Sequence, residues 1–254
     1  MLNHKGHFFH WTLEGLSRLA YYVDFLRNNP QIRILIVRKH VLQKVTWLEA
    51  LGIEGSRVIT GYVTARVVYL PQGSLCTASV PPLGMMLLSQ YLLTFIHTYI
   101  RPARAPRDAI LLIHRTSKRW LAQHDIIKDY LAITAEKHNM ELLIFSDLRL
   151  PSLSVTMEIF HRAALVVAPH GAGLVNLLFS RAPTVVVEVV QSDSTFSYVN
   201  MCRSLGHVYH GITSRSDVTE GKEPMYVNLD RLQTTVQFYL DEFILPNEKQ
   251  VLRN

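Results

Sequence analysis

The sequence has few of the features that mark disulfide-rich or metal-dependent proteins. Only two cysteines, Cys76 and Cys202, occur among 254 residues, so at most one internal disulfide can form and a disulfide framework is excluded. No Asp-x-Asp motif occurs, which disfavours a site where carboxylates hold Mg²⁺ or Mn²⁺ against a ligand. His4, His7 and His10 recur every third residue, but no further ligands at matching spacing complete a metal site. We therefore predict no essential metal.

Long apolar runs and blocks of like charge are also missing. The most apolar stretch, residues 83–100, is interrupted by polar residues such as Ser89 and Gln90, which favours a buried helix over a membrane span. Residues 1–7 lack the apolar core of a secretory signal. The net charge is +6, yet no five like charges are consecutive. This balance favours a small anionic ligand, and we do not expect nucleic acid as a partner.

The composition, 48% hydrophobic and 18% charged, is that of a globular protein with one large domain or two small ones. The first half alternates helical and strand-like patterns. Its expected elements are a helix over 8–28, a strand over 32–37, a helix over 42–51, short strands at 58–59 and 67–69, and a long helix after Pro81-Pro82. The Pro- and Arg-rich segment 101–107 is the predicted linker.

The α/β alternation is more regular in the second half. Its expected elements are strands at 109–113, 141–145, 165–168 and 184–190, with helices at 125–138, 155–163 and 174–179 between them. Continuous β-branched runs such as Val185-Val186-Val187 predict parallel strands that are buried on both faces. We predict an α/β protein with an N-terminal domain over residues 1–100, a C-terminal domain over 107–245, and a polar tail from Pro246.

A small-residue turn follows the predicted strand at 165–168. Its residues are His170, Gly171, Ala172 and Gly173, and Leu174 begins the next helix. Backbone N–H groups in such a turn can approach a phosphate closely, and the helix N-terminus adds positive potential. A dinucleotide fingerprint would need a third glycine where Asn176 stands, which argues against a dehydrogenase. Two glycines are also compatible with a turn that only packs a helix on a strand.

Three other groups lie near predicted strand ends, where ligands of α/β sheets bind. Arg115, Lys118 and Arg119 follow the strand at 109–113, and guanidinium groups suit phosphate oxygens; a solvated basic loop is the alternative. Glu188 could accept hydrogen bonds from ribose hydroxyls, or pair with an arginine. His170 could donate to a diphosphate or to a sugar hydroxyl, or cap a helix.

Residues 166–179, followed by 184–188, resemble the signature block of glycosyltransferase family 61. This family includes protein O-linked N-acetylglucosaminyltransferases and plant xylosyl- and arabinosyltransferases. Residues 7–14 resemble its aromatic–His–Trp block, and residues 113–115 with Arg119 resemble its arginine block. Leu205-Gly206 resembles a later Leu-Gly pair, so the resemblance covers most of the chain.

The resemblance implies two Rossmann-like domains that face a cleft, as in GT-B enzymes. It also implies an inverting hexosyl- or pentosyltransferase that moves N-acetylglucosamine or a pentose from a UDP-sugar to a hydroxyl of a protein or glycan. The UDP-sugar is then a substrate, and no cofactor is expected. The family's setting implies the lumen of the endoplasmic reticulum or Golgi. Only six residues precede the aromatic block, so an incomplete first domain is one interpretation. An inactive relative that acts as a binding or scaffold protein is the alternative function.

Inverting transfer requires a base that removes the proton of the acceptor hydroxyl. His10 and Glu14 are four residues apart on the predicted first helix, and therefore on one face of it. Both belong to the block that resembles the family's, and Glu14 matches its acidic position. We predict that one of them is the base. A hydrogen bond on a helix face without a catalytic role is the alternative.

Overall fold

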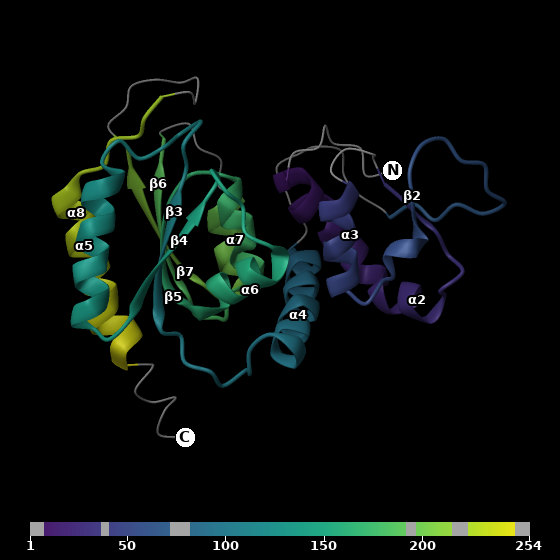
Figure 1. The fold of residues 1–254 in the computed structure, drawn as a ribbon, viewed down its shortest axis with the longest axis horizontal. Helices are drawn as coiled ribbons and strands as arrows, with labels where there is room; N and C mark the ends of the chain where they lie inside the picture. Colours follow the sequence, from purple (N-terminus) through teal and green to yellow (C-terminus); the bar gives the residue numbers. More distant parts are fainter. Residues whose placement is uncertain (1–7, 37–40, 72–81, 192–196, 215–222, 247–254) are drawn as a thin grey trace. The chain divides into compact units, whose positions relative to one another are not determined.

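The computed structural model describes residues 8–36, 41–71, 82–191, 197–214 and 223–246. The chain divides into two compact units, Met1–Tyr99 and Ile100–Asn254. Each unit has its own secondary structure and core (Figure 1), and each is described by itself.

Unit 1 is largely helical and contains one short parallel pair of strands. Its elements are η1 (His10–Leu16), α1 (Ser17–Leu19), η2 (Ala20–Tyr22), α2 (Val23–Asn28), β1 (Ile34–Leu35), α3 (Val41–Ala50), η3 (Gly55–Arg57), β2 (Val58–Ile59) and α4 (Pro82–Tyr99). The expected helix over 8–28 is therefore a composite, in which η1 is a π-helix and η2 a 3-10 turn. The predicted apolar helix is α4, with Leu88, Leu92 and Ile96 buried.

The strand predicted at 67–69 is wrong. Residues 62–65 and 67–71 have no regular secondary structure, and the side chains of Val67, Val68 and Tyr69 are more than 60% exposed. β-Branched residues favour a strand only where a neighbouring strand satisfies the backbone and a core covers one face. The pair β1–β2 aligns Ile34 with Val58 and Leu35 with Ile59. β2 is therefore the strand expected at 58–59, whereas β1 is shorter than the strand expected over 32–37.

A buried arginine organises the end of α2 and the start of β1. Arg57 is 5% exposed. Its guanidinium donates to the carbonyls of Leu26 at 2.8 Å, Ile32 at 3.0 Å and Asn29 at 3.1 Å. The carbonyls of Leu26 and Asn29 also accept backbone hydrogen bonds, from the N–H groups of Asn29 and Ile32. Arg57 therefore adds a charged donor to carbonyls of the helix end and of the turn that follows it.

Unit 2 is a five-stranded parallel sheet with helices on both faces. Its elements are β3 (Ala109–His114), α5 (His124–Lys137), β4 (Glu141–Ser146), α6 (Leu153–Arg162), β5 (Ala163–Pro169), η4 (Ala172–Phe179), β6 (Val185–Val190), α7 (Ser197–Leu205), β7 (Val208–Thr213), α8 (Leu229–Tyr239) and η5 (Leu240–Ile244). The strand order is β4-β3-β5-β6-β7. The predicted α/β class with parallel strands is thus confirmed.

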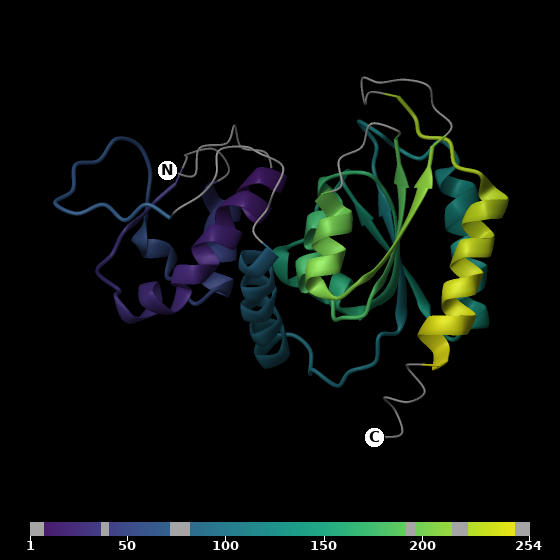
Figure 2. The ribbon, with the colours of Figure 1, turned by 180° about the vertical axis from the view of Figure 1, so that it is seen from behind.

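The helices form a layer on each side of this sheet. Helices α5 and α8 cover one face, and α6 and α7 cover the other, as both views show (Figures 1 and 2). The central strands β3, β5 and β6 are almost wholly buried, as their apolar runs predict. On the α5–α8 face, Ile110, Val167 and Val187 pack with Leu131 and Val236 in one hydrophobic core.

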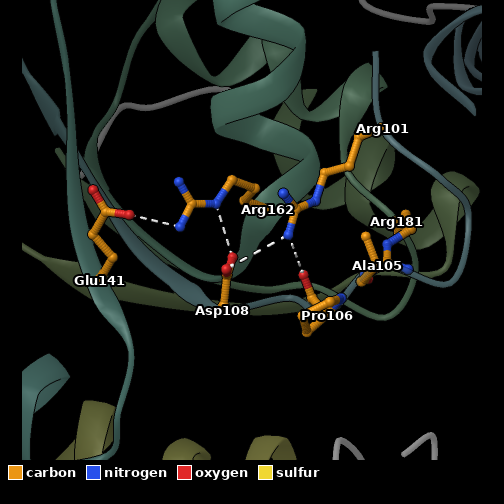
Figure 3. A network of polar contacts seen from close by, with 7 residues as sticks. All are labelled: Arg101, Ala105, Pro106, Asp108, Glu141, Arg162 and Arg181. Atoms are coloured by element: carbon orange, nitrogen blue, oxygen red, sulfur yellow. Dashed lines mark hydrogen bonds and ion pairs between the residues drawn. The ribbon is translucent and has the colours of Figure 1, made fainter. Parts of the chain in front are cut away.

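An ion-pair network lies where the strands begin (Figure 3). Arg162, at the end of α6, donates to Asp108 at 2.8 Å and to Glu141 at 2.6 Å, and the two carboxylates hold the pKa of Arg162 above its ordinary value. Arg101 contacts Asp108 at 3.5 Å, and Arg181 donates to the carbonyl of Ala105 at 2.6 Å. The Pro- and Arg-rich segment is therefore bonded to the amino edge of the sheet. Because ligands of such sheets bind at the opposite edge, we assign this network a structural role.

Sequence reasoning missed α7, β7 and α8. The strand β7 carries His210 and Gly211 and is only half buried at the sheet edge, so it lacks the apolar run of a central strand. The tail predicted after Pro246 lies outside the described residues. The same holds for Cys76, His4 and His7. Within the described ranges, no helix is long and apolar enough to cross a membrane.

Candidate functional site

The candidate site lies at the carboxyl ends of β3 and β5. The chain order of the strands reverses here, because β4 lies on one side of β3 and β5 on the other. In open α/β sheets the two chain segments diverge at such a switch point and leave a crevice for a ligand. His114 ends β3 and Pro169 ends β5, so the predicted arginine segment and the predicted glycine turn leave the sheet side by side.

Arg115 lies directly on the glycine turn. Its Nη1 donates to the carbonyl of His170 at 2.8 Å. A Cβ atom at position 171 would be 1.5 Å from the same nitrogen, so only glycine leaves room for the guanidinium. Burial, followed by the charge of Arg119, lowers the pKa of Arg115. The structure therefore brings together Arg115, Arg119 and the turn, which the sequence places more than 50 residues apart.

The turn leads into η4, a 3-10 helix rather than an α-helix. A Cβ atom at Gly173 would lie 3.0 Å from Cγ2 of Ile113, so this glycine lets the turn pack on β3. The side chain of Leu174 is fully buried and its N–H donates to the carbonyl of Gly171 at 3.0 Å. Leu174 thus stabilises the turn and has neither its side chain nor its N–H available to a ligand, whereas the predicted contact of Ala172 stays a prediction.

His170 and Glu188 form a buried pair. His170 Nδ1 lies 2.6 Å from Glu188 Oε1, and the Tyr209 hydroxyl donates to Glu188 Oε2 at 2.7 Å. Glu188 is 1% exposed, and both of its oxygens are occupied. The expected contact between Glu188 and a ribose stays a prediction, whereas the partners of Glu188 among the described residues are a histidine and a tyrosine rather than an arginine.

Two further side chains of α7 surround this pair. The Tyr198 ring lies 5.3 Å from the His170 ring, and burial together with the Glu188 charge raises the pKa of Tyr198. The same two causes raise the pKa of the Cys202 thiol to about 12, so this thiol is protonated and unreactive. Tyr198 and Tyr209 had no signal in the sequence, because neither belongs to a recognisable spacing pattern.

The loop after β3 supplies a second guanidinium. Arg119 has a left-handed backbone with φ 52°, which costs a non-glycine residue about 1 kcal/mol. Its Nε is enclosed without a hydrogen-bond partner. Lys118 is exposed. Among the described residues, no carboxylate lies within 4.0 Å of Arg115, Lys118 or Arg119, so none of the three forms an ion pair in the described part of the chain.

A pair of histidines lies on the β4 side of the same loop. The rings of His114 and His124 stack at 3.8 Å, and His114 Nδ1 lies 3.2 Å from the hydroxyl of Ser146. Burial and the neighbouring His114 lower the pKa of His124. This pair adds a polar wall to the carboxyl edge of the sheet.

In unit 1, the predicted base residues contact each other. His10 Nδ1 lies 2.9 Å from Glu14 Oε1 within the π-helix η1. π-Helical turns are uncommon and occur often at functional sites. The adjacent Trp11 ring packs against the buried Lys44, whose Nζ lies 5.1 Å from the ring centre, and burial lowers the pKa of Lys44. Sequence reasoning missed Lys44, since a lone lysine on a helix is usually solvated.

Within the described ranges, no cluster of three or more His, Cys, Asp or Glu side chains is arranged to hold a metal ion.

A comparison with family models gives a match to Glycosyltransferase 61 over residues 8–187. The chain belongs to glycosyltransferase family 61. No curated protein matched the chain. The family match includes η1 with its His10–Glu14 pair, Arg115 and the glycine turn, and it ends inside β6 just before Glu188. Membership indicates a transferase that moves a sugar from a donor to an acceptor.

Proposed function

We propose that the protein is an inverting glycosyltransferase that moves N-acetylglucosamine or a pentose from a UDP-sugar to a hydroxyl of a protein or glycan. The observation that carries this proposal is the pair Arg115 and Arg119 at the switch point, next to the glycine turn and without a carboxylate partner among the described residues. Unpaired guanidinium groups beside a strand-to-helix turn are suited to a diphosphate.

The same groups suit the chemistry of the leaving diphosphate. As the bond between the sugar and the nucleoside diphosphate breaks, negative charge develops on the phosphate oxygens. Fixed cations aimed at that charge stabilise the transition state. Arg115 is held by its bond to His170, and Lys118 is an exposed cation on the same loop. Donor binding by these side chains needs no divalent metal.

In this proposal the acceptor is activated in unit 1. Either His10 or Glu14, whose Nδ1 and Oε1 atoms lie 2.9 Å apart, removes the proton of the attacking hydroxyl. The arrangement is then of the GT-B kind, with unit 2 as the donor-binding domain and unit 1 as part of the acceptor-binding domain. We also propose that the protein works in the secretory pathway, the setting implied by its resemblance to O-linked transferases.

Calorimetry with a panel of UDP-sugars tests donor binding. Arg115→Ala removes the guanidinium over Gly171, and we expect it to weaken UDP-sugar binding about 10- to 100-fold, since a hydrogen bond to a charged group contributes about 1.5–3 kcal/mol. Arg149→Ala, at an exposed position on another loop, is the matched control and should bind like the wild type. Failure of the wild type to bind any UDP-sugar would overturn the proposal.

A hydrolysis and transfer assay tests the base. Glu14→Gln keeps the size of the side chain but removes the carboxylate that could accept a proton. If Glu14 is the base, turnover falls about 100-fold or more while UDP-sugar binding is unchanged. Unchanged turnover would exclude Glu14 and leave His10. UDP-sugar binding without turnover by the wild type, on acceptors or on water, would favour the inactive scaffold.

A further inference from the structure

The buried Glu188 carboxylate forms a hydrogen bond with one ring nitrogen of His170. Nδ1 lies 2.6 Å from Glu188 Oε1, and the second oxygen of Glu188 already accepts a hydrogen bond from Tyr209. A carboxylate accepts and does not donate, so the proton in the His170–Glu188 contact is on Nδ1. In a neutral ring Nε2 is then the nitrogen without a proton, and the structure gives it no hydrogen bond to a described residue.

This arrangement prepares His170 for a second proton. The ring is at the carboxyl end of β5, and its own carbonyl accepts the hydrogen bond from Arg115, so the ring belongs to the same site as the guanidinium groups. Glu188 is 1% exposed, and a carboxylate without water stabilises a neighbouring imidazolium strongly.

Groups from several elements face the ring. Glu188 on β6 contacts the ring, and Arg115 after β3 donates to the carbonyl of the same residue. The charges of Arg119 and Asp147 act on Arg115. Tyr198 and Cys202 on α7, and Tyr209 on β7, are neutral because their pKa values are raised. These charges together set the balance at the ring before an anion enters. A diphosphate beside Arg115 changes that balance in favour of a proton on Nε2.

We propose that the nucleotide-sugar diphosphate binds with uptake of one proton by His170 Nε2, and that Glu188 is the positioning residue that makes this uptake possible. The protonated ring then donates from Nε2 to a diphosphate oxygen, while Nδ1–H stays bonded to Glu188. The proton comes from solvent, and no covalent bond changes. The inference rests on the proposed function only for the identity of the ligand.

The ring tautomer is tested first, on the ligand-free protein. Long-range ¹H–¹⁵N NMR spectra of wild type and His170→Asn identify the His170 signals by difference. We expect the proton on Nδ1 and none on Nε2 at pH 8, and protons on both nitrogens after addition of UDP-N-acetylglucosamine or UDP-xylose. A free ring with its proton on Nε2 would overturn the inference, whatever the protein binds.

Calorimetry at pH 8 in buffers of different ionisation enthalpy then counts the protons. The diphosphate of a UDP-sugar does not titrate near pH 8, so any proton uptake on binding reports on the protein. For the wild type we expect about 0.5–1 proton, and hence an affinity that falls up to about tenfold per pH unit as the pH rises. Glu188→Gln keeps a polar side chain but removes the charge, and its uptake should be close to zero.

Tyr209→Phe is the matched control, since it removes a hydrogen bond from the same carboxylate and leaves the charge. Its proton uptake should equal that of the wild type. Equal loss of uptake in both variants would show a structural effect and contradict the inference. UDP-sugar binding without proton uptake by the wild type would overturn the inference and leave the proposed function intact.

If no UDP-sugar binds, the same NMR experiment with inorganic sulfate, which keeps its charge at pH 8, decides between the two claims. Protonation of Nε2 by bound sulfate would support the proton-coupled anion site while the proposed function fails. No change in the ring would overturn both.

Discussion

At the scale of single residues, position 171 requires glycine because of a neighbouring side chain and not because of its own backbone conformation. Its φ is 161°, an extended conformation open to any residue. The constraint is Arg115 Nη1, which would be 1.5 Å from a Cβ atom. A glycine that seems to be a generic turn residue is therefore a partner of an arginine 56 positions earlier in the chain, and the pair stabilises the site as a unit.

We therefore predict that the effects of Gly171→Ala and Arg115→Ala are not additive. Gly171→Ala alone should lower the free energy of unfolding by about 1–3 kcal/mol, because the guanidinium must move. In the Arg115→Ala background the methyl group has room, so most of that cost should vanish. Urea unfolding of the four proteins in the cycle measures the coupling. Additive effects would mean that Arg115 does not occupy this space.

His207 gives a second prediction at this scale. Its Nδ1 accepts from the N–H of Thr184 and its Nε2–H donates to the carbonyl of Leu177, each at 3.3 Å. Burial, with a smaller contribution from Arg107, lowers the pKa of His207 from 6.5 to about 4. Between these values the unfolded chain binds a proton that the folded chain does not, so folding loses free energy as the pH falls.

The contribution of neutral His207 is thus complete above pH 6.5 and declines as the pH falls toward 4. The decline can reach about 3 kcal/mol, at about 1.4 kcal/mol per pKa unit. His207→Gln removes the titration, and the difference in unfolding free energy between wild type and variant should shrink over this window. A difference that stays constant with pH would show that the folded protein tolerates a charged His207.

At the scale of elements, Arg57 links α2, the following turn and β1 through three carbonyls. Arg57→Ala removes three hydrogen bonds made by a buried charged side chain and should destabilise the protein by about 2–4 kcal/mol. Arg33→Ala is the matched control, because Arg33 is exposed and donates to one carbonyl, that of Ser56; it should cost less than about 0.5 kcal/mol. Thermal and urea unfolding compare the two. Equal effects would contradict the assigned role of Arg57.

The elements that sequence patterns predicted are those with a dominant core face. Strands β3, β5 and β6 have continuous apolar runs and are buried on both sides. The segment at 67–69 also consists of β-branched and aromatic residues, but it has no partner strand among the described residues and it is exposed. The edge strand β7 shows the reverse, since pairing with β6 forms a strand that its own polar residues do not predict. Composition therefore predicts a strand only where burial in the core, and not pairing with a neighbouring strand, determines whether the strand forms.

At the scale of the whole molecule, the two units have different expected tasks. The predicted donor-binding residues lie in unit 2, and His10 and Glu14 lie in unit 1. Unit 2 has its own parallel sheet, hydrophobic core and ion-pair network, so a fragment of residues 100–246 should fold alone. It should bind UDP-sugars as the full chain does and transfer no sugar. Circular dichroism, calorimetry and a transfer assay measure these properties. A folded fragment with much weaker UDP-sugar binding would show that unit 1 supplies donor contacts.

The sequence by itself determined the parallel α/β class, the family, and a glycine turn after a buried strand, because each depends on local spacing and burial. Only the tertiary structure decided which groups meet. Strand order put β3 beside β5, and hence Arg115 on Gly171. Register put Glu188 between Ala168 of β5 and Gly211 of β7, where it bonds His170 and Tyr209. Hydrogen-bond partners across a sheet follow from register, and register is set by the packing of whole strands rather than by any one motif.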